Sequence, residues 1–228
     1  MDLGAALKDL IKRVVFGHES RPRRIGFGLL RGLRLVTDPQ RHAQRLLGLY
    51  EKEIECHIRK ATARARTAVD IGAHDGWYAT FFASRPNISK VLACDRNSVT
   101  IGALTGNLNL NDLSRKVALH HVTVGSSKSA SCRSLDDLLA KQEPPFVIKV
   151  DVDGGELDVL MSGRAVLTEQ KCELVVETHS AELEADCLRY LQELGYDTTV
   201  IPNAWYRRFI PELRMVPHNR WFVAQRNP

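Results

Sequence analysis

Short apolar runs alternate with stretches of helical character over most of the chain. The apolar runs lie at 67–71, 90–94, 117–124, 146–150, 173–176, 198–201 and 221–224. Stretches that predict helices lie between most of them, at 77–82, 98–109, 134–139, 157–161 and 182–194. Brief, continuously apolar runs are typical of strands buried on both faces, and their alternation with helices is typical of βαβ units. The pattern predicts an α/β fold, with a mostly parallel sheet and helices on both faces.

The last apolar run departs from this alternation, because an irregular segment precedes it instead of a clear crossover helix. Antiparallel neighbours need no such crossover, so the last strand is predicted to be antiparallel. Ser98 and Ser134 are predicted to cap the helices that follow them. The serine-rich segment 125–133 is predicted to be a mobile loop.

The first 66 residues show a different pattern. It predicts, in order, an amphipathic helix over 3–14, a basic break at 21–24, two short strands at 25–29 and 32–37, a helix over 41–47 capped at Asp38, and a helix over 53–65. We therefore expect an N-terminal extension at 1–66 and one α/β domain at 67–228.

The stretch 67–77 is the centre of this arrangement. Its first five residues form a predicted buried strand, and Gly72 and Gly76 allow a tight turn in which the backbone can approach a ligand closely. The helix that follows presents its N-terminal amides to the same place. Asp70 lies at the carboxyl end of the strand, where open α/β sheets bind their ligands.

The residues around this turn indicate which ligand it holds. The dinucleotide pattern G-x-G-x-x-G is absent, which disfavours a nicotinamide oxidoreductase. An acid two residues before Gly72 would repel a pyrophosphate but suits a cation, and S-adenosylmethionine carries an ammonium and a sulfonium. Asp95, after the next strand, is placed to bind both ribose hydroxyls. The sequence thus favours S-adenosylmethionine as cofactor.

Acids end four of the predicted strands: Asp70, Asp95, Asp151 with Asp153, and Glu177 with His179 two residues on. In a parallel sheet these side chains meet at one edge. Three functions are open for them. They could bind the cationic cofactor, hold a divalent metal through oxygen ligands, or supply a general base.

Charge is distributed unevenly along the 228 residues. Residues 1–66 hold 15 Lys and Arg against 7 Asp and Glu, a net charge of +8, and the remainder carries −3 of the total of +5. Such a basic region could face an anionic lipid, a nucleic acid or a phosphorylated substrate, or form an ordinary solvated surface. The helix predicted over 3–14 could dock on its own domain, on the partner in a homodimer, or on a membrane surface.

Cysteine spacing and hydropathy indicate in which cellular compartment the protein is expected. The five cysteines are widely spaced, which favours neither a disulfide framework nor a zinc site. No run approaches 18 apolar residues, and the first residues do not look like a signal peptide. We expect a cytoplasmic protein, with peripheral membrane contact as a further option.

Several motifs together resemble the FkbM family of S-adenosylmethionine-dependent methyltransferases. They are residues 69–78 (VDIGAHDGWY), 148–156 (IKVDVDGGE) and 176–179 (VETH), supported by 134–138 (SLDDL) and 50–53 (YEKE). The similarity spans roughly residue 32 to the end of the chain. His74 stands where the family usually has asparagine, and Asp153 where it usually has glutamate.

The resemblance implies a Rossmann-like class I methyltransferase fold with seven strands, and O-methylation of a sugar or natural-product hydroxyl. It also implies the cofactor contacts: Asp70, Gly72, His74, Gly76, Trp77, Asp95, Asn97, Thr123, Val124 and Asp151. Thr123 and Val124 would border the adenine, and Asp151 would lie near the methyl group. Asp153, Glu177 and His179 would face the acceptor.

For the acceptor proton, His179 is the first choice as base because imidazole titrates in the useful range. Asp151 or Asp153 is the rival, alone or through Mg²⁺ held by Asp151, Asp153 and Glu177. Trp205 and Arg207 could stack on a saccharide and hold an anionic group.

A different class of function stays open. The chain could be a catalytically silent binding module that recruits RNA or an anionic membrane through its basic region. No RNP-like motif or aromatic-rich basic stripe is present, so a nucleic-acid partner is not expected.

Overall fold

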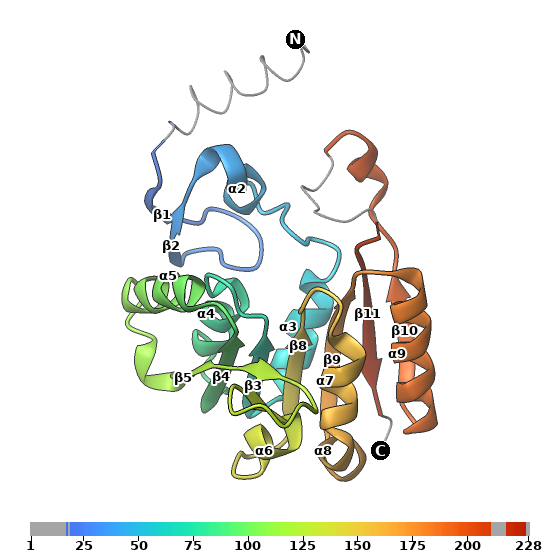
Figure 1. Ribbon diagram of the computed structural model, residues 1–228. Coiled ribbons are helices and arrows are strands. Elements are labelled where there is room, and N and C mark those ends of the chain that lie inside the picture. The colour runs from blue at the N-terminus through green and yellow to red at the C-terminus, as the bar shows by residue number, and fades with distance from the viewer. Residues whose placement is uncertain (1–16, 18, 211–217, 227–228) are drawn as a thin grey trace.

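The computed structural model describes residues 17, 19–210 and 218–226, and the helix predicted over 3–14 lies outside them. A seven-stranded sheet with the order β10-β11-β9-β8-β3-β4-β5 forms the centre of the molecule (Figure 1). Its strands are β3 (Thr67–Ile71), β4 (Lys90–Asp95), β5 (Val117–His121), β8 (Phe146–Val150), β9 (Cys172–Thr178), β10 (Asp197–Ile201) and β11 (Arg220–Gln225). All neighbours pair in parallel except β11, which is antiparallel to β9 and to β10. The predicted fold class and the antiparallel last strand are confirmed.

The apolar character of the strands follows from their place in the sheet. Val69 of β3 is paired with Leu92 on one side and Ile148 on the other, and all three are buried. Because helices cover both faces, a central strand needs apolar side chains at every position rather than at alternate ones. The strand order reverses between β3 and β8, so the ligand-binding edge of the sheet lies at their carboxyl ends.

The helices divide between two hydrophobic clusters, one on each face of the sheet. The first cluster takes residues from α3 (Glu55–Arg64), α4 (Trp77–Ala83) and α5 (Ser98–Asn109), and the second from α6 (Leu135–Leu139), α7 (Glu156–Ser162), α8 (Arg164–Glu169) and α9 (Ala181–Glu193). Neighbouring residues of β3 alternate between the clusters, with Ala68 in the first and Val69 in the second. Helices on both faces are therefore confirmed.

In residues 19–66, the described part of the predicted N-terminal extension, a hairpin is followed by helices, and the division into an extension and a domain stays a prediction. Strand β1 (Arg21–Arg24) pairs antiparallel with β2 (Arg34–Thr37), and α2 (Pro39–Leu46) begins after Asp38, whose carboxylate accepts from the Gln40 amide at 2.8 Å as predicted for a cap. The backbone amide of Val36 donates to Asn107 of α5, and that of Arg34 donates to Asn111 just beyond the end of α5, both at 2.8 Å. These side chains tie the hairpin to the sheet domain.

Several local predictions were wrong. The first strand of the hairpin is 21–24, not 25–29, because Ile25, Leu29 and Leu30 anchor a loop in the first hydrophobic cluster instead of pairing. Helix α5 is capped by Asn97, whose side chain accepts from the Val99 amide, not by Ser98.

The third apolar run is also not one strand. It divides into β5 and a separate β6 (Thr123–Val124), which pairs with β7 (Cys132–Arg133). Part of the segment predicted to be a loop at 125–133 is therefore a strand. The chain also forms α8 and two 3-10 helices, η1 (Ser114–Lys116) and η2 (Trp205–Arg208), that the sequence pattern did not predict.

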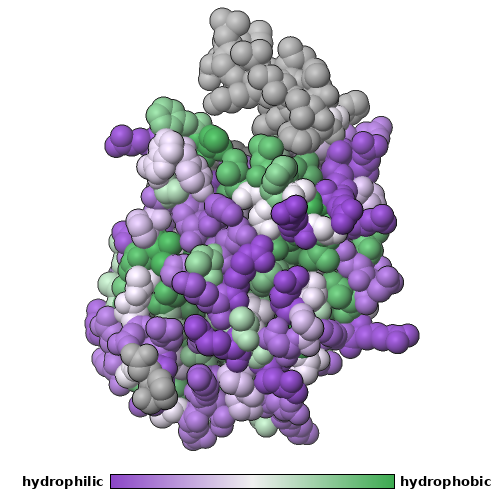
Figure 2. Space-filling model, turned by 180° about the vertical axis from the view of Figure 1, so that it is seen from behind, coloured by the Kyte–Doolittle hydropathy of each residue, from purple (hydrophilic) through white to green (hydrophobic). Residues whose placement is uncertain are grey.

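Surface properties vary along the molecule. Seen from behind, hydrophilic side chains cover much of the lower half, and hydrophobic ones are more frequent toward the upper end (Figure 2). No helix among the described residues is long and apolar enough to span a bilayer.

The close backbone contact at the turn after β3 is expected to make the protein sensitive to substitution of Gly72. Gly72 has φ +82°, and a Cβ atom there would lie 1.7 Å from the Asp151 carbonyl oxygen. We expect Gly72→Ala to lower the free energy of unfolding by about 2–5 kcal/mol, because left-handed strain and a backbone clash add together. Gly102→Ala in α5 is the matched control, since a Cβ there meets nothing within 4 Å. Urea denaturation of both variants measures the difference, and equal stability of the two would contradict the contact.

Candidate active site

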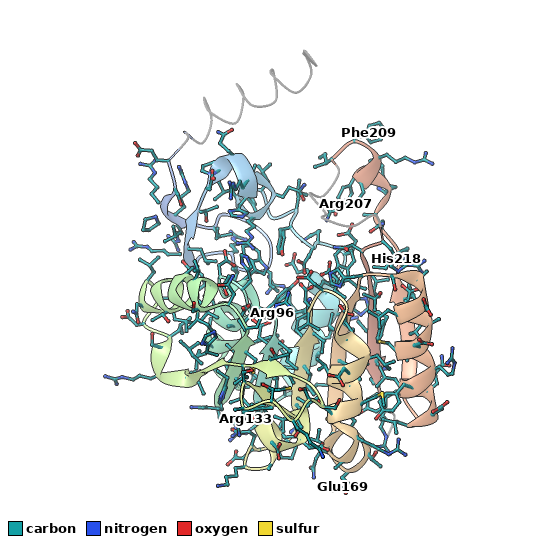
Figure 3. The ribbon with its side chains drawn as sticks, in the orientation of Figure 1. Arg96, Arg133, Glu169, Arg207, Phe209 and His218 are labelled. Atoms are coloured by element: carbon teal, nitrogen blue, oxygen red, sulfur yellow. The ribbon has the colours of Figure 1, made fainter. Side chains whose placement is uncertain are left out.

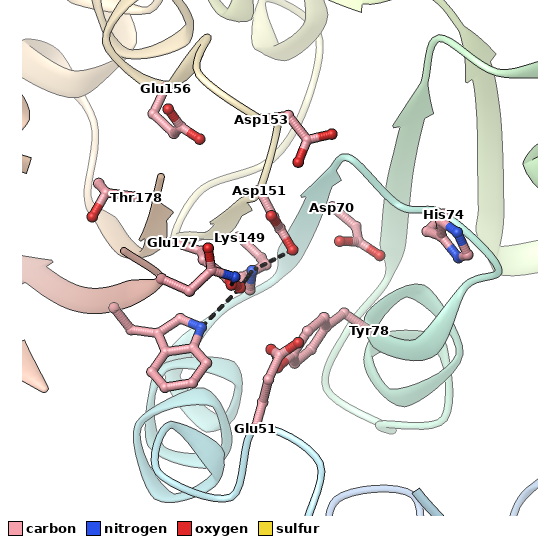
Figure 4. A network of polar contacts seen from close by, with 12 residues as sticks. Glu51, Asp70, His74, Tyr78, Lys149, Asp151, Asp153, Glu156, Glu177 and Thr178 are labelled. Carbon is pink, nitrogen blue, oxygen red and sulfur yellow. Dashed lines mark hydrogen bonds and ion pairs between the residues drawn. The ribbon is translucent and has the colours of Figure 1, made fainter. Parts of the chain in front are cut away.

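The carboxyl ends of β3, β4, β8 and β9 bring the predicted acids to one edge of the sheet. Figure 4 shows Asp70, Asp151, Asp153 and Glu177 around the end of the sheet, together with Lys149, Glu51 and Tyr78, which the sequence analysis did not select. Since these residues come from well-separated parts of the chain, the cluster forms only in the folded protein.

The glycine turn and the end of β4 are joined by hydrogen bonds. Gly72, His74 and Gly76 all have positive φ, between +46° and +88°. One Asp95 carboxylate oxygen accepts from the His74 amide and the other from the Asn97 amide, each at 2.8 Å. Asp95 thus stays partly exposed and fixed beside the turn, and its contact with a ribose stays a prediction.

Asp70 is buried at the end of β3 and bonds to the protein itself. Its Oδ2 accepts from the Ala79 amide at 2.8 Å, which fixes the first turn of α4 against the strand. Burial raises the pKa of Asp70 to about 7, and the charge of Asp151 adds to the effect while Lys149 opposes it. Its direct contact to a cofactor ammonium stays a prediction.

A buried arginine from the extension holds the glycine turn. The Arg45 guanidinium pairs with Asp75, and it lies 4.7 Å from the ring centroid of Tyr50 and 5.2 Å from that of Trp77. Burial disfavours the charged carboxylate, but Arg45 and His74 outweigh it and hold the pKa of Asp75 well below its usual range. The turn is therefore fixed from outside the sheet domain by a residue that no motif indicated.

Lys149 is the buried cation of the carboxylate cluster. It is fully buried in β8, and its Nζ lies 3.4 Å from Asp151 Oδ2 and 3.7 Å from Glu177 Oε2. Glu177 also accepts from Asn219 Nδ2 at 2.8 Å and from Trp221 Nε1 at 2.9 Å. Burial raises the pKa of Glu177 well above its usual value, and the nearby Asp151 and Glu51 raise it further. Glu177, expected to touch the acceptor, is thus bonded mainly to the protein.

Glu51 and Tyr78 close the other side of the cluster. The Tyr78 hydroxyl bonds to the Glu51 carboxylate, and the Tyr78 ring centroid lies 5.2 Å from Lys149 Nζ. Burial raises the pKa of Glu51, although Lys149 opposes the shift. Glu51, like Arg45, comes from the extension, so the first 66 residues contribute directly to this edge.

His179 forms a pair with Glu156. Its Nδ1 lies 2.6 Å from Glu156 Oε1, and Glu156 is fully buried at the first position of α7. The other ring nitrogen, Nε2, lies 3.6 Å from Asp151 and 3.5 Å from Asp153. Burial disfavours the charged ring, but Glu156 and the two aspartates outweigh it and raise the pKa of His179.

A cavity of about 420 Å³ opens beside this histidine. Its lining residues are Asp153, Gly154, His179, Ser180, Glu182, Leu183 and Asp186. Neither Asp151 nor Asp153 caps α7, because Gly155 holds the N-cap position. Asp153 has φ +46° and its side chain is 75 % exposed, so its carboxylate is accessible beside the His179 ring.

The remaining predicted residues lie at different distances from these groups. Thr123 is exposed and Val124 buried in β6, and Trp77 is buried against Tyr50. Trp205 is 78 % exposed on η2. The guanidinium of Arg207, which Figure 3 labels, pairs with Glu53 at 2.6 Å. Because Arg207 fixes η2 to the extension, contacts of Trp205 and Arg207 with an acceptor stay predictions.

The residues that could hold a metal differ from the predicted set. Within the described part of the chain, ligand atoms of Asp151, Glu177 and His179 lie within 4.8 Å of one another. His179 thus takes the place that the sequence analysis gave to Asp153.

A parallel sheet with an antiparallel last strand, a glycine turn after β3 and an acid after β4 define a class I methyltransferase fold. Known structures share it. A methyltransferase FkbM from Methylobacillus flagellatus has a TM-score of 0.57 and 17 % identity over 70 % of this chain. This chain covers only 43 % of that protein.

Two further structures agree. Precorrin 8w decarboxylase from Methanobacterium thermoautotrophicum has a TM-score of 0.52 and 20 % identity, covering 76 % of this chain and 89 % of that protein. A putative methyltransferase from Streptococcus mutans in complex with SAH has a TM-score of 0.52 and 10 % identity, covering 78 % and 99 %. At these identities the likeness shows the fold.

A match to a protein family is more specific than a shared fold. Residues 123–198 match the Methyltransferase FkbM domain, which confirms the resemblance to that family over this segment. The segment contains Asp151, Asp153, Glu156 and His179. The comparison with curated proteins gives no match.

The buried ion pair between Arg45 and Asp75 is expected to contribute to the stability of the fold. Arg45→Met keeps much of the side-chain volume but leaves Asp75 buried without its cation, so we expect a loss of about 3–5 kcal/mol in the free energy of unfolding. Arg41→Met in the same helix is the control, because the Arg41 side chain is 82 % exposed. Denaturant titration measures both variants. If Arg45→Met is as stable as Arg41→Met, the pair does not hold the turn.

Proposed function

We propose that the chain is an S-adenosylmethionine-dependent O-methyltransferase in which His179 deprotonates the acceptor hydroxyl. The observation that carries the proposal is the pairing of His179 with Glu156 next to a cavity, at the edge of the sheet where the glycine turn lies. The match to the FkbM domain over the same residues supports it.

The charge of the site fits a cationic cofactor. Four carboxyl groups, those of Glu51, Asp70, Asp151 and Glu177, surround one ammonium, that of Lys149. A second cation bound beside them would favour the charged forms of Glu51, Asp70 and Glu177, whose pKa values are raised. We infer that Asp95 would hold the ribose, that the 72–76 backbone would follow the methionine part, and that Thr123 and Val124 would border the adenine. When bound, S-adenosylmethionine supplies an electrophilic methyl group on a sulfonium leaving group.

The hydrogen bond to Glu156 determines what His179 can do. We assign the tautomer in which Nδ1 donates to Glu156 and Nε2 accepts a hydrogen bond. A hydroxyl held near Nε2 would transfer its proton there as its oxygen forms the bond to carbon. Asp151 and Asp153, both within 3.6 Å of Nε2, then stabilise the imidazolium that results. The exposed Asp153 offers the proton a way to solvent.

For the acceptor we propose a small molecule with several hydroxyls, such as a saccharide or a related natural product. The cavity beside His179 is lined largely by carboxylates and a serine, which hydrogen-bond hydroxyl groups well. The silent binding module has no observation that specifically favours it, and it predicts that the residues of this site are dispensable for binding.

Cofactor binding is tested by calorimetric titration with S-adenosylhomocysteine. We expect micromolar affinity, and at least a tenfold loss in Asp95→Ala, because the ribose loses its carboxylate. Asp137→Ala, an exposed acid outside the site, is the control and should bind normally. Absence of binding to the unaltered protein would remove the methyltransferase proposal and favour the binding module.

The role of His179 is tested by the dependence of kcat/KM on pH. Since the base must be neutral and its pKa is raised above 6.5, the rate should fall as the pH drops through a value above 6.5. His179→Ala should lower kcat by about 10²–10⁴-fold. Affinity for S-adenosylhomocysteine should change little.

Glu156→Gln separates positioning from proton transfer. Without the carboxylate the pKa of His179 should drop, and the acidic limb of the profile should move to lower pH together with a lower kcat. A profile in Glu156→Gln that keeps the unaltered midpoint would show that Glu156 does not act on His179.

A further inference from the structure

We propose that the Lys149 ammonium is the built-in cation of the acceptor site and occupies the place of a divalent metal, so that the reaction needs no metal ion. This inference rests on the proposed function, and it concerns the group of Asp151, Glu177 and His179. It makes Lys149 a positioning residue for the carboxylates around the base.

Lys149 is buried among the carboxylates at the end of the sheet. Its side chain leaves β8 beneath the end of the sheet and lies between Asp151 and Glu177 (Figure 4). The residue is fully buried, and Nζ makes ion-pair contacts of 3.4 and 3.7 Å to their carboxylates. A lysine this deeply buried keeps its charge only if anions surround it. Here those anions are the same carboxylates that a metal would use.

A divalent metal would compete with the Lys149 ammonium for the same ligands. Asp151, Glu177 and His179 could contribute one ligand atom each, all within 4.8 Å of one another. Mg²⁺ requires oxygen ligands at about 2.0–2.1 Å, which would place it next to an ammonium that already contacts two of the three residues. Both carboxylate oxygens of Glu177 also accept hydrogen bonds, one from Asn219 and the other from Trp221. Like-charge repulsion and occupied ligands therefore disfavour the metal.

The Lys149 ammonium is connected to the proposed base, His179, through Asp151. Asp151 contacts Lys149 through Oδ2 and lies 3.6 Å from His179 Nε2 through Oδ1. One carboxylate thus bridges the buried cation and the imidazole. Lys149 fixes the orientation of Asp151, and Asp151 in turn lies where the imidazolium forms.

Titration with MnCl₂ is the primary test of the proposal because it needs neither acceptor nor cofactor, and methyl transfer is a second readout. We expect the unaltered protein to bind no Mn²⁺ up to millimolar concentration, and methyl transfer to be unchanged after EDTA treatment. In Lys149→Met, which keeps an unbranched side chain without the charge, we expect a new Mn²⁺ site with submillimolar affinity. We also expect at least a 10²-fold loss of methyl transfer, partly restored by Mn²⁺. In Lys149→Arg the cation remains, so Mn²⁺ should still be excluded.

Two results would overturn the inference. One is stoichiometric Mn²⁺ binding by the unaltered protein that His179→Ala abolishes. The other is a folded Lys149→Met that gains no Mn²⁺ site. If Lys149→Met fails to fold, Lys149→Gln, which removes the charge but keeps a polar end group for the buried site, is titrated in its place and is expected to gain the same Mn²⁺ site. Titration with S-adenosylhomocysteine is read separately, so a failure of the proposed function is distinguishable from a failure of this inference.

Discussion

The site depends on one close approach between backbones, that of the glycine turn after β3 to the end of β8. A side chain at residue 72 would overlap the Asp151 carbonyl oxygen, so only glycine lets the two central strands end side by side. This contact sets the distance between the turn that would receive the cofactor and the loop that carries Asp151 and Asp153. The acids beyond it reach the same edge because the strands that carry them are parallel.

Two buried cations stabilise the groups around this contact, and each joins separate parts of the chain. Arg45 links α2 to Asp75 in the glycine turn, and Lys149 links β8 to Asp151 and to Glu177 of β9. A buried charge is costly unless it is paired, so each cation restricts its partners to one arrangement. Arg45 thereby couples α2 to the glycine turn, and Lys149 couples the ends of β8 and β9 beside the proposed base.

Much of this arrangement could be predicted from local pattern. Continuous apolar runs identified β3 and β8, Asp38 and Ser134 were recognised as caps, and the irregular segment before β11 indicated its antiparallel direction. The roles of Arg45, Glu51 and Glu156 could not be predicted, because their partners lie 23 to 30 residues away in sequence. Lys149 did leave a signal: it is a charged residue inside an apolar run, which a buried strand accepts only with partners. The hairpin was misplaced because Ile25 and Leu29 suit a strand and a buried loop equally well.

The hairpin of the extension also explains part of the basic charge of the first 66 residues. On its inner edge, the free amides of β2 are taken by Asn107 and Asn111. On its outer edge, β1 consists of three arginines and Pro22, the residue types with which natural proteins block the addition of another strand. In the part of the chain that the structure describes, no strand pairs with this outer edge. Charged side chains and a proline there disfavour the addition of a strand from another molecule.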